Sequence, residues 1–130
     1  MTVRGGKQPT PKERVVQRQI VNGLRQLGLR VRHYPNGVKY AGTVMERNRQ
    51  AAVMRADGLI PGFPDLQVVK PGKPPLYGHL EVKREGVSLS TDHARRQLDC
   101  HEAMRHDGEN VAVVNTLDQA LEAVKSWGML

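Results

Sequence analysis

The chain has 130 residues, a length that suits one domain with a single hydrophobic core. Lysine and arginine number 20 against 13 aspartates and glutamates, and the resulting net charge of +7 favours a polyanionic partner, nucleic acid before an anionic membrane surface. The single cysteine, Cys100, excludes an intrachain disulfide, and the lack of any membrane-length or signal-peptide-like apolar run leads us to expect a cytoplasmic protein without a membrane partner.

The first predicted element is a helix that follows a basic N-terminal arm. Residues 1–9 are polar, basic and rich in glycine, so we expect a flexible arm, with one domain over residues 10–130. Thr10 is the expected N-cap, and Glu13 follows it by three residues. Apolar residues then repeat at helical spacing: Val16, Ile20, Leu24 and Leu27. Glu13 is therefore either half of a capping box or a carboxylate that the helix carries towards a metal ion.

Basic residues dominate the next two predicted elements. Residues 29–34 alternate between apolar and basic side chains, which is typical of a half-exposed strand whose basic face carries Arg30 and Arg32. Residues 43–57 predict a helix with enough apolar side chains for one packed face. Three arginines lie along this helix: Arg47, Arg49 and Arg55. A solvated helix face and contacts to phosphate groups explain them equally well.

Two short strands, residues 65–69 and 76–83, flank a turn rich in proline and glycine. Asp65 opens the first strand, while Glu81 and Lys83 close the second on one face because strand side chains alternate. If the two strands pair, Asp65 approaches Glu81. Two carboxylates, with the Val82 carbonyl between Glu81 and Lys83, suit Mg²⁺ or Mn²⁺, whereas the alternative is an ordinary cross-strand ion pair.

The C-terminal third predicts helix, strand and helix. Ser90 or Thr91 caps a helix that runs to about residue 106. His101 shares a face of this helix with Gln97, and we expect it to be solvated there, with contact to phosphate as the alternative. Its expected core contacts are Ala94, Leu98 and Met104. The apolar run 111–114 suits a buried strand, and Thr116 caps the last helix. The order helix, strand, helix, strand, strand, helix, strand, helix predicts an α/β domain with helices flanking a small mixed sheet.

The sequence Pro64-Asp65, followed by Glu81-Val82-Lys83, resembles the signature of the PD-(D/E)XK nuclease superfamily. It is most similar to one branch, the VRR-NUC (virus-type replication-repair nuclease) domain. Further segments resemble that branch in order and spacing, over residues 11–127 of the chain: Glu13, 34–37, 55–58, 61–66, 79–83, Leu89-Ser90, Gln97, and the final strand and helix.

The resemblance implies a restriction-endonuclease-like fold and Mg²⁺- or Mn²⁺-dependent endonuclease cleavage of DNA, often branched DNA such as four-way junctions or flaps. It also implies a homodimer. The implied metal ligands are Glu13, Asp65 and Glu81, and the Val82 carbonyl, which lies between Glu81 and Lys83, completes the expected metal shell. The implied catalytic residues are Asp65, Glu81, Lys83 and a supporting Gln97. The candidate contacts to the DNA backbone are Arg30, Arg32, Arg47, Arg49 and Arg55.

One position departs from the family pattern. The family glutamine follows the Leu-Ser pair closely, whereas Gln97 lies about one helical turn further on and His93 occupies the nearer position. The sequence leaves open which of the two takes the glutamine's place. It also leaves open a second class of function, a basic module that binds nucleic acid without cleaving it.

Overall fold

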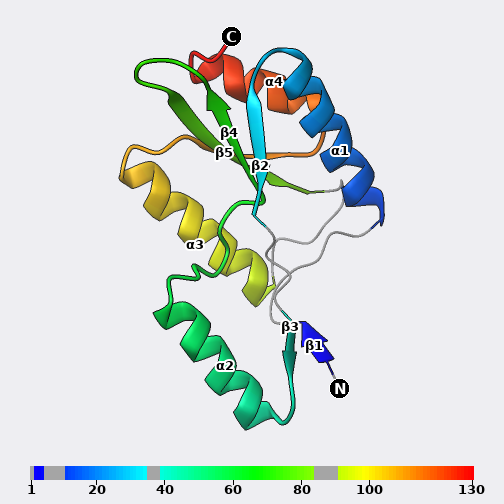
Figure 1. Ribbon diagram of the computed structural model, residues 1–130, viewed down its shortest axis with the longest axis vertical. Coiled ribbons are helices and arrows are strands. Elements are labelled where there is room, and N and C mark those ends of the chain that lie inside the picture. The colour runs from blue at the N-terminus through cyan, green and yellow to red at the C-terminus, as the bar shows by residue number, and fades with distance from the viewer. Residues whose placement is uncertain (1, 5–10, 35–38, 84–90) are drawn as a thin grey trace.

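The computed structural model describes residues 2–4, 11–34, 39–83 and 91–130 (Figure 1). Its helices are α1 (Pro11–Gln26), α2 (Val44–Ala56), α3 (Asp92–His106) and α4 (Leu117–Ser126). Its strands are β1 (Thr2–Arg4), β2 (Arg30–His33), β3 (Lys39–Ala41), β4 (Leu66–Lys70), β5 (Leu76–Val82) and β6 (Val111–Val114). None of the helices in these ranges is long and apolar enough to cross a membrane.

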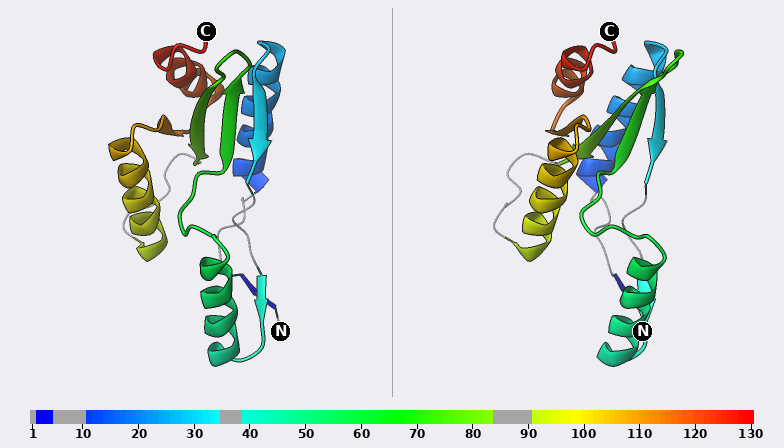
Figure 2. Two further views of the ribbon diagram at one scale, coloured as in Figure 1. Left: turned by 60° about the vertical axis from the view of Figure 1, so that its left-hand side comes forward. Right: turned by 90° about the vertical axis from the view of Figure 1, so that its left-hand side faces the viewer.

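The central sheet has four strands in the order β2-β4-β5-β6. The first three strands pair antiparallel with their neighbours, and β5 pairs parallel with β6. Helices α1 and α4 lie together beside the sheet, and α3 is set apart from them (Figures 1 and 2). This mixed sheet flanked by helices confirms the predicted α/β class with its restriction-endonuclease-like arrangement.

One face of the sheet carries the hydrophobic core. Alternate residues of β4 and β5, such as Leu66 and Leu80, contact α1 and α4 through a buried aliphatic cluster. The members contributed by the two helices and the C-terminus are Ile20, Leu24, Ala120, Val124 and Met129. Trp127 packs so closely on β5 that a Cβ at Gly78 would lie 2.4 Å from its ring, so this glycine lets α4 approach the sheet. The opposite face of β5 is left to polar residues.

The predicted helix over residues 43–57 forms, but its predicted packed face does not. Thr43 caps α2 and makes a capping box with Glu46, as the local sequence dictates. No residue of α2 is buried, although all of them are described, and Met45 is 70% exposed. Helix α2 instead joins β1 and β3 in a separate lobe that projects from the end of the sheet (Figure 2). We call these three elements the α2 lobe.

Three smaller predictions are also corrected. Residues 2–4 of the predicted flexible arm form strand β1, which pairs antiparallel with β3. Leu27 and Leu98 are exposed instead of buried, and Leu27 lies beyond the last residue of α1. Residues 5–10, including the proposed cap Thr10, lie outside the described residues. The caps Thr91 and Thr116 are confirmed.

Candidate active site

Strand pairing brings Asp65 and Glu81 together, as the sequence predicted. Leu66 pairs with Leu80, so the residue before β4 lies beside the next residue of β5. The backbone N–H of Asp65 donates to Oε2 of Glu81 at 3.2 Å, and the N–H of Val82 donates to Oδ2 of Asp65 at 3.0 Å. These two reciprocal bonds fix both carboxylates against the backbone of the other strand. Asp65 is 7% exposed and Glu81 is fully buried.

Lys83 and Gln97 both approach the other oxygen of Glu81. The Lys83 ammonium lies 3.4 Å from Oε1, and the side-chain amide of Gln97 donates to the same atom at 2.5 Å. Both residues are buried, at 7% and 4% exposed. The structure therefore gathers Asp65, Glu81, Lys83 and Gln97 at one edge of the sheet. The side chain of His93 lies outside the described part of the chain, so its role stays open.

The loop before Asp65 is pressed against α3. Gly62 has φ +79°, and a Cβ there would lie 2.7 Å from the carbonyl oxygen of Arg96 and 2.8 Å from Cα of Gln97. Only glycine allows this approach without displacing the backbone. Because the same loop leads directly into Asp65, this contact fixes the spacing between Asp65 and Gln97.

Phe63, in the loop before Asp65, is the centre of an aromatic cluster. Its ring meets Tyr34 edge-on at 5.4 Å and His79 at 5.3 Å. The backbone N–H of Tyr34 also donates to the carbonyl of Asp65 at 2.7 Å. The end of β2, the loop and β5 are thereby held together around the first carboxylate.

Two buried histidines that the sequence did not assign to the site lie beside it. His101, expected to be solvated, is 1% exposed, and burial lowers its pKa to about 4, helped by the positive charges of Arg105 and Lys83. Burial also lowers the pKa of His79. Neither ring nitrogen of His101 makes a well-formed hydrogen bond within the described residues, although the Gly62 backbone lies near enough to oppose its pKa shift slightly.

His101 is therefore neutral at neutral pH, and Lys83 supplies the positive charge beside Glu81. The sequence contained signals for both histidines. His101 follows Gln97 by one helical turn, and His79 precedes Glu81 on the same strand face. Sequence patterns do not reveal how deeply such polar side chains are buried.

The carboxylate pair fits a hard divalent cation. Asp65, Glu81 and Lys83 together carry one negative charge in excess when all are ionised, and Mg²⁺ is commonly held by one or two carboxylates plus waters. Glu13 is 3% exposed in the first turn of α1, a helix that contacts β5. No group of three acidic, histidine or cysteine side chains that could hold a metal ion occurs among residues 2–4, 11–34, 39–83 and 91–130. A metal site formed by the carboxylates of Glu13, Asp65 and Glu81 therefore stays a prediction.

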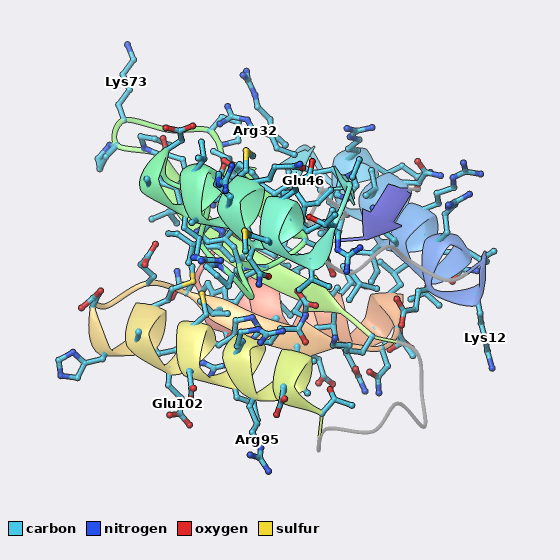
Figure 3. All side chains as sticks on the ribbon, turned by 90° about the horizontal axis from the view of Figure 1, so that it is seen from below. Lys12, Arg32, Glu46, Lys73, Arg95 and Glu102 are labelled. Carbon is cyan, nitrogen blue, oxygen red and sulfur yellow. The ribbon has the colours of Figure 1, made fainter. Side chains whose placement is uncertain are left out.

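The five predicted DNA-contacting arginines fall into two groups. Arg30 and Arg32 are exposed on edge strand β2, and pairing through β4 puts them on the sheet face that carries Glu81. Arg32 lies on the same side of the molecule as Lys73 of the β4–β5 turn (Figure 3). The other three belong to the α2 lobe: Arg47, Arg49 and Arg55. The guanidinium of Arg47 donates to the carbonyl of Gly42 at 3.0 Å, so it is partly engaged within that lobe.

Two solved structures share this architecture. A "VRR_NUC domain" aligns with a TM-score of 0.57 and 27% identity, covering 89% of this chain and 97% of that chain. A "VRR_NUC domain protein" aligns with a TM-score of 0.59 over 92% of this chain and 90% of that chain, and at 19% identity it shows the fold alone. No family model and no curated protein matches the sequence significantly.

The four-stranded mixed sheet and its flanking helices define an α/β domain with a nuclease-like fold. The structural match at 27% identity supports a VRR-NUC domain, which confirms the resemblance found in the sequence.

Proposed function

We propose that this protein is an intracellular, metal-dependent endonuclease that hydrolyses phosphodiester bonds in DNA, with a preference for branched DNA such as four-way junctions or flaps. The observation that supports this most strongly is the buried Asp65–Glu81 pair, flanked by Lys83 and Gln97 at one sheet edge. The name of the structural match at 27% identity points to the same class of enzyme. The preference for branched DNA follows from the family resemblance.

Mg²⁺, or Mn²⁺ in its place, is the cofactor that suits these oxygen ligands. Asp65, Glu81 and the Val82 carbonyl would hold it, with Glu13 as a further ligand. Such an ion lowers the pKa of bound water and neutralises charge on the phosphate.

The chain's own residues keep the site ordered. Gln97 and Lys83 both bind Oε1 of Glu81, while the Asp65 N–H binds Oε2, so the Glu81 carboxylate has a fixed orientation. In our proposal Lys83 orients the attacking water and stabilises the negative charge that develops on the phosphate. Its ammonium is preorganised for this because Glu81 lies 3.4 Å away and solvent is largely excluded.

We also propose a homodimer that forms through the α2 lobe. Met45 and Val53 are 70% and 54% exposed on one side of α2, and no residue of this helix is buried within its own chain. A second copy of the chain would cover these apolar side chains. Light scattering should find a dimer for the wild type and a monomer for Met45→Glu/Val53→Glu. Leu98→Glu, at an exposed position on α3, is the control that should remain dimeric.

The nuclease proposal is tested with forked, flap, four-way and linear DNA in Mg²⁺, Mn²⁺ or EDTA. The wild type should cut branched DNA with either metal and stop in EDTA. Lys83→Met should cut at least about 100-fold more slowly because it removes the stabilising charge. Lys125→Met, on the exposed side of α4, should retain wild-type rates. Full activity of purified Lys83→Met would reject the assignment.

A binding module without catalysis is the alternative that the net charge of +7 and the exposed arginines favour. It predicts salt-sensitive DNA binding, no cleavage with any metal, and no effect of Asp65→Asn. The buried carboxylates count against it, because they repel phosphate and a pure binder gains nothing from them.

A further inference from the structure

A second feature lies on the sheet face that carries Glu81. Tyr77 precedes Glu81 by four residues on β5, so the two side chains share a face about 13 Å apart along the strand at a rise of about 3.3 Å per residue. Beside Tyr77, a hollow of about 250 Å³ opens between β2, β4 and the β4–β5 turn. Residues that line it include Arg30, Arg32, Val69, Pro71, Pro75 and Tyr77. We call it the Tyr77 hollow.

The Tyr77 hollow combines positive charge with an aromatic wall. Val69, 5% exposed, supplies an apolar floor, and Tyr77 is 49% exposed at the side. The guanidinium of Arg32 donates to Oε1 of Gln67 at 3.2 Å, which orients it on the sheet surface. None of the described residues that line the hollow is acidic. An aromatic ring beside two cations is the combination that accepts a base and its phosphates.

The acidic charge of this region lies on the other side of Tyr77. A neighbouring hollow of about 450 Å³ also includes Tyr77 but is lined by Glu109 and His79. Glu109 lies 3.7 Å from the His79 ring nitrogen. Negative phosphates are therefore favoured only on the arginine side of Tyr77. A nucleotide bound at Tyr77 would accordingly have its phosphate towards Arg30 and Arg32.

The half-exposed ring of Tyr77 indicates that the bound nucleic acid is single-stranded. In a duplex the base faces are already stacked on one another, so they are not available to Tyr77. An unpaired strand offers both bases and phosphates. A flat duplex backbone would also leave the concave floor at Val69 unfilled.

We infer that the Tyr77 hollow binds a single-stranded nucleic acid segment, with a base on Tyr77 and phosphates at Arg30 and Arg32. The position of this segment relative to the cleaved bond rests on the proposed nuclease function, whereas the binding itself does not. The offset of about 13 Å corresponds to about four stacked nucleotides, so the segment is an unpaired tail adjoining the bond that is cut.

Fluorescence anisotropy with a short labelled oligothymidylate in EDTA tests the binding site without any cleavage. Tyr77→Ala should weaken binding roughly 5- to 150-fold, and Tyr77→Phe should restore it because stacking needs only the ring. Arg30→Ala/Arg32→Ala should also weaken binding. The control Arg14→Ala/Arg18→Ala removes the same charge from exposed positions on α1 and should have much less effect. Circular dichroism confirms that each variant is folded.

Equal binding by Tyr77→Ala and the wild type would overturn the inference. So would displacement of the oligothymidylate by duplex DNA or by an acidic peptide as effectively as by unlabelled oligothymidylate. A parallel assay in Mg²⁺ compares cutting of flap DNA with and without its unpaired tail. Tyr77→Ala should abolish the advantage that the tail gives. If the wild type cuts nothing but Tyr77→Ala loses binding, the nuclease proposal fails while the binding site stands.

Discussion

The side-chain amide of Gln97 on α3 donates a hydrogen bond to Oε1 of Glu81, a fully buried residue on β5 that lies 16 positions earlier in the chain. The Lys83 ammonium approaches the same oxygen at 3.4 Å. Gln97 is therefore placed to orient the Glu81 carboxylate, although its sequence position is shifted from that of the family glutamine. Its supporting role in catalysis remains a prediction that substitution can test.

Gln97→Ala should lower the cleavage rate roughly 10- to 100-fold, because partners that orient a metal-binding group typically contribute this much. Gln97→Glu should be at least as damaging, since it places another negative charge against Glu81. Single-turnover cleavage of branched DNA measures both. Gln26→Ala, at an exposed residue at the end of α1, is the control that should cut normally. An unchanged cleavage rate in Gln97→Ala would show that Gln97 does not support catalysis.

Glu13 has two explanations that one substitution separates. Glutamine supports a capping box as well as glutamate does, but it removes the negative charge that a metal ligand needs. Glu13→Gln should therefore leave the unfolding free energy unchanged and weaken Mn²⁺ binding about tenfold, measured by electron paramagnetic resonance. Glu122→Gln, exposed on α4, should bind Mn²⁺ normally. Unaltered Mn²⁺ affinity in Glu13→Gln would leave Glu13 with a structural role only.

The buried histidine on α3 predicts a specific pH dependence of stability. Burial lowers the pKa of His101 from 6.5 to about 4, so the unfolded chain binds the proton more readily between these values. The contribution of neutral, buried His101 to the unfolding free energy is fully present above pH 6.5 and is lost as the pH falls towards 4. The wild type should lose about 2 kcal/mol of unfolding free energy from this residue between pH 7 and pH 5.

Urea unfolding at several pH values measures this effect. His101→Leu should lose less stability than the wild type over the same interval, whatever its stability at pH 7. His106→Leu is the control on the same helix, because the His106 side chain is 91% exposed. Parallel pH profiles for His101→Leu and the wild type would show that His101 is not responsible.

Gly62 and Gly58 form a matched pair for testing the contact between the Asp65 loop and α3. Both have positive φ, at +79° and +108°, so alanine strains either backbone by about 1–2 kcal/mol. Only at Gly62 does the added methyl meet the α3 backbone, at 2.7 Å, whereas nothing lies within 4 Å at Gly58. Gly62→Ala should therefore cost a further 1–3 kcal/mol or so and slow cleavage, as urea unfolding and rate measurements can establish. Equal effects of the two substitutions would argue against a tight contact.

Local sequence signals predicted the elements that depend on local physics. Threonine caps, helical spacing and strand alternation placed α1 to α4 and the four strands of the main sheet within a few residues. The approach of Asp65 to Glu81 was also predictable, because a short turn pairs β4 with β5 antiparallel. The VRR-NUC resemblance then supplied the fold.

The remaining features depend on contacts between distant segments. Strands β1 and β3 have three residues each, too few for an alternating pattern. The apolar residues of α2 predicted a packed face, but periodicity cannot say whether the partner is the same chain. The placement of Gln97 against Glu81 depends on how closely α3 approaches the loop at Gly62, and the burial of His101 follows from the same packing.

The most direct test of the central claim is cleavage of a labelled four-way junction by the wild type and Glu81→Gln in Mg²⁺. Glutamine keeps the shape of the buried side chain but removes the charge that a metal ion requires. We predict cutting by the wild type that EDTA stops, and a folded Glu81→Gln protein that cuts at least about 100-fold more slowly. Cutting by Glu81→Gln at the wild-type rate would contradict the assignment of the Asp65–Glu81 pair as the catalytic centre.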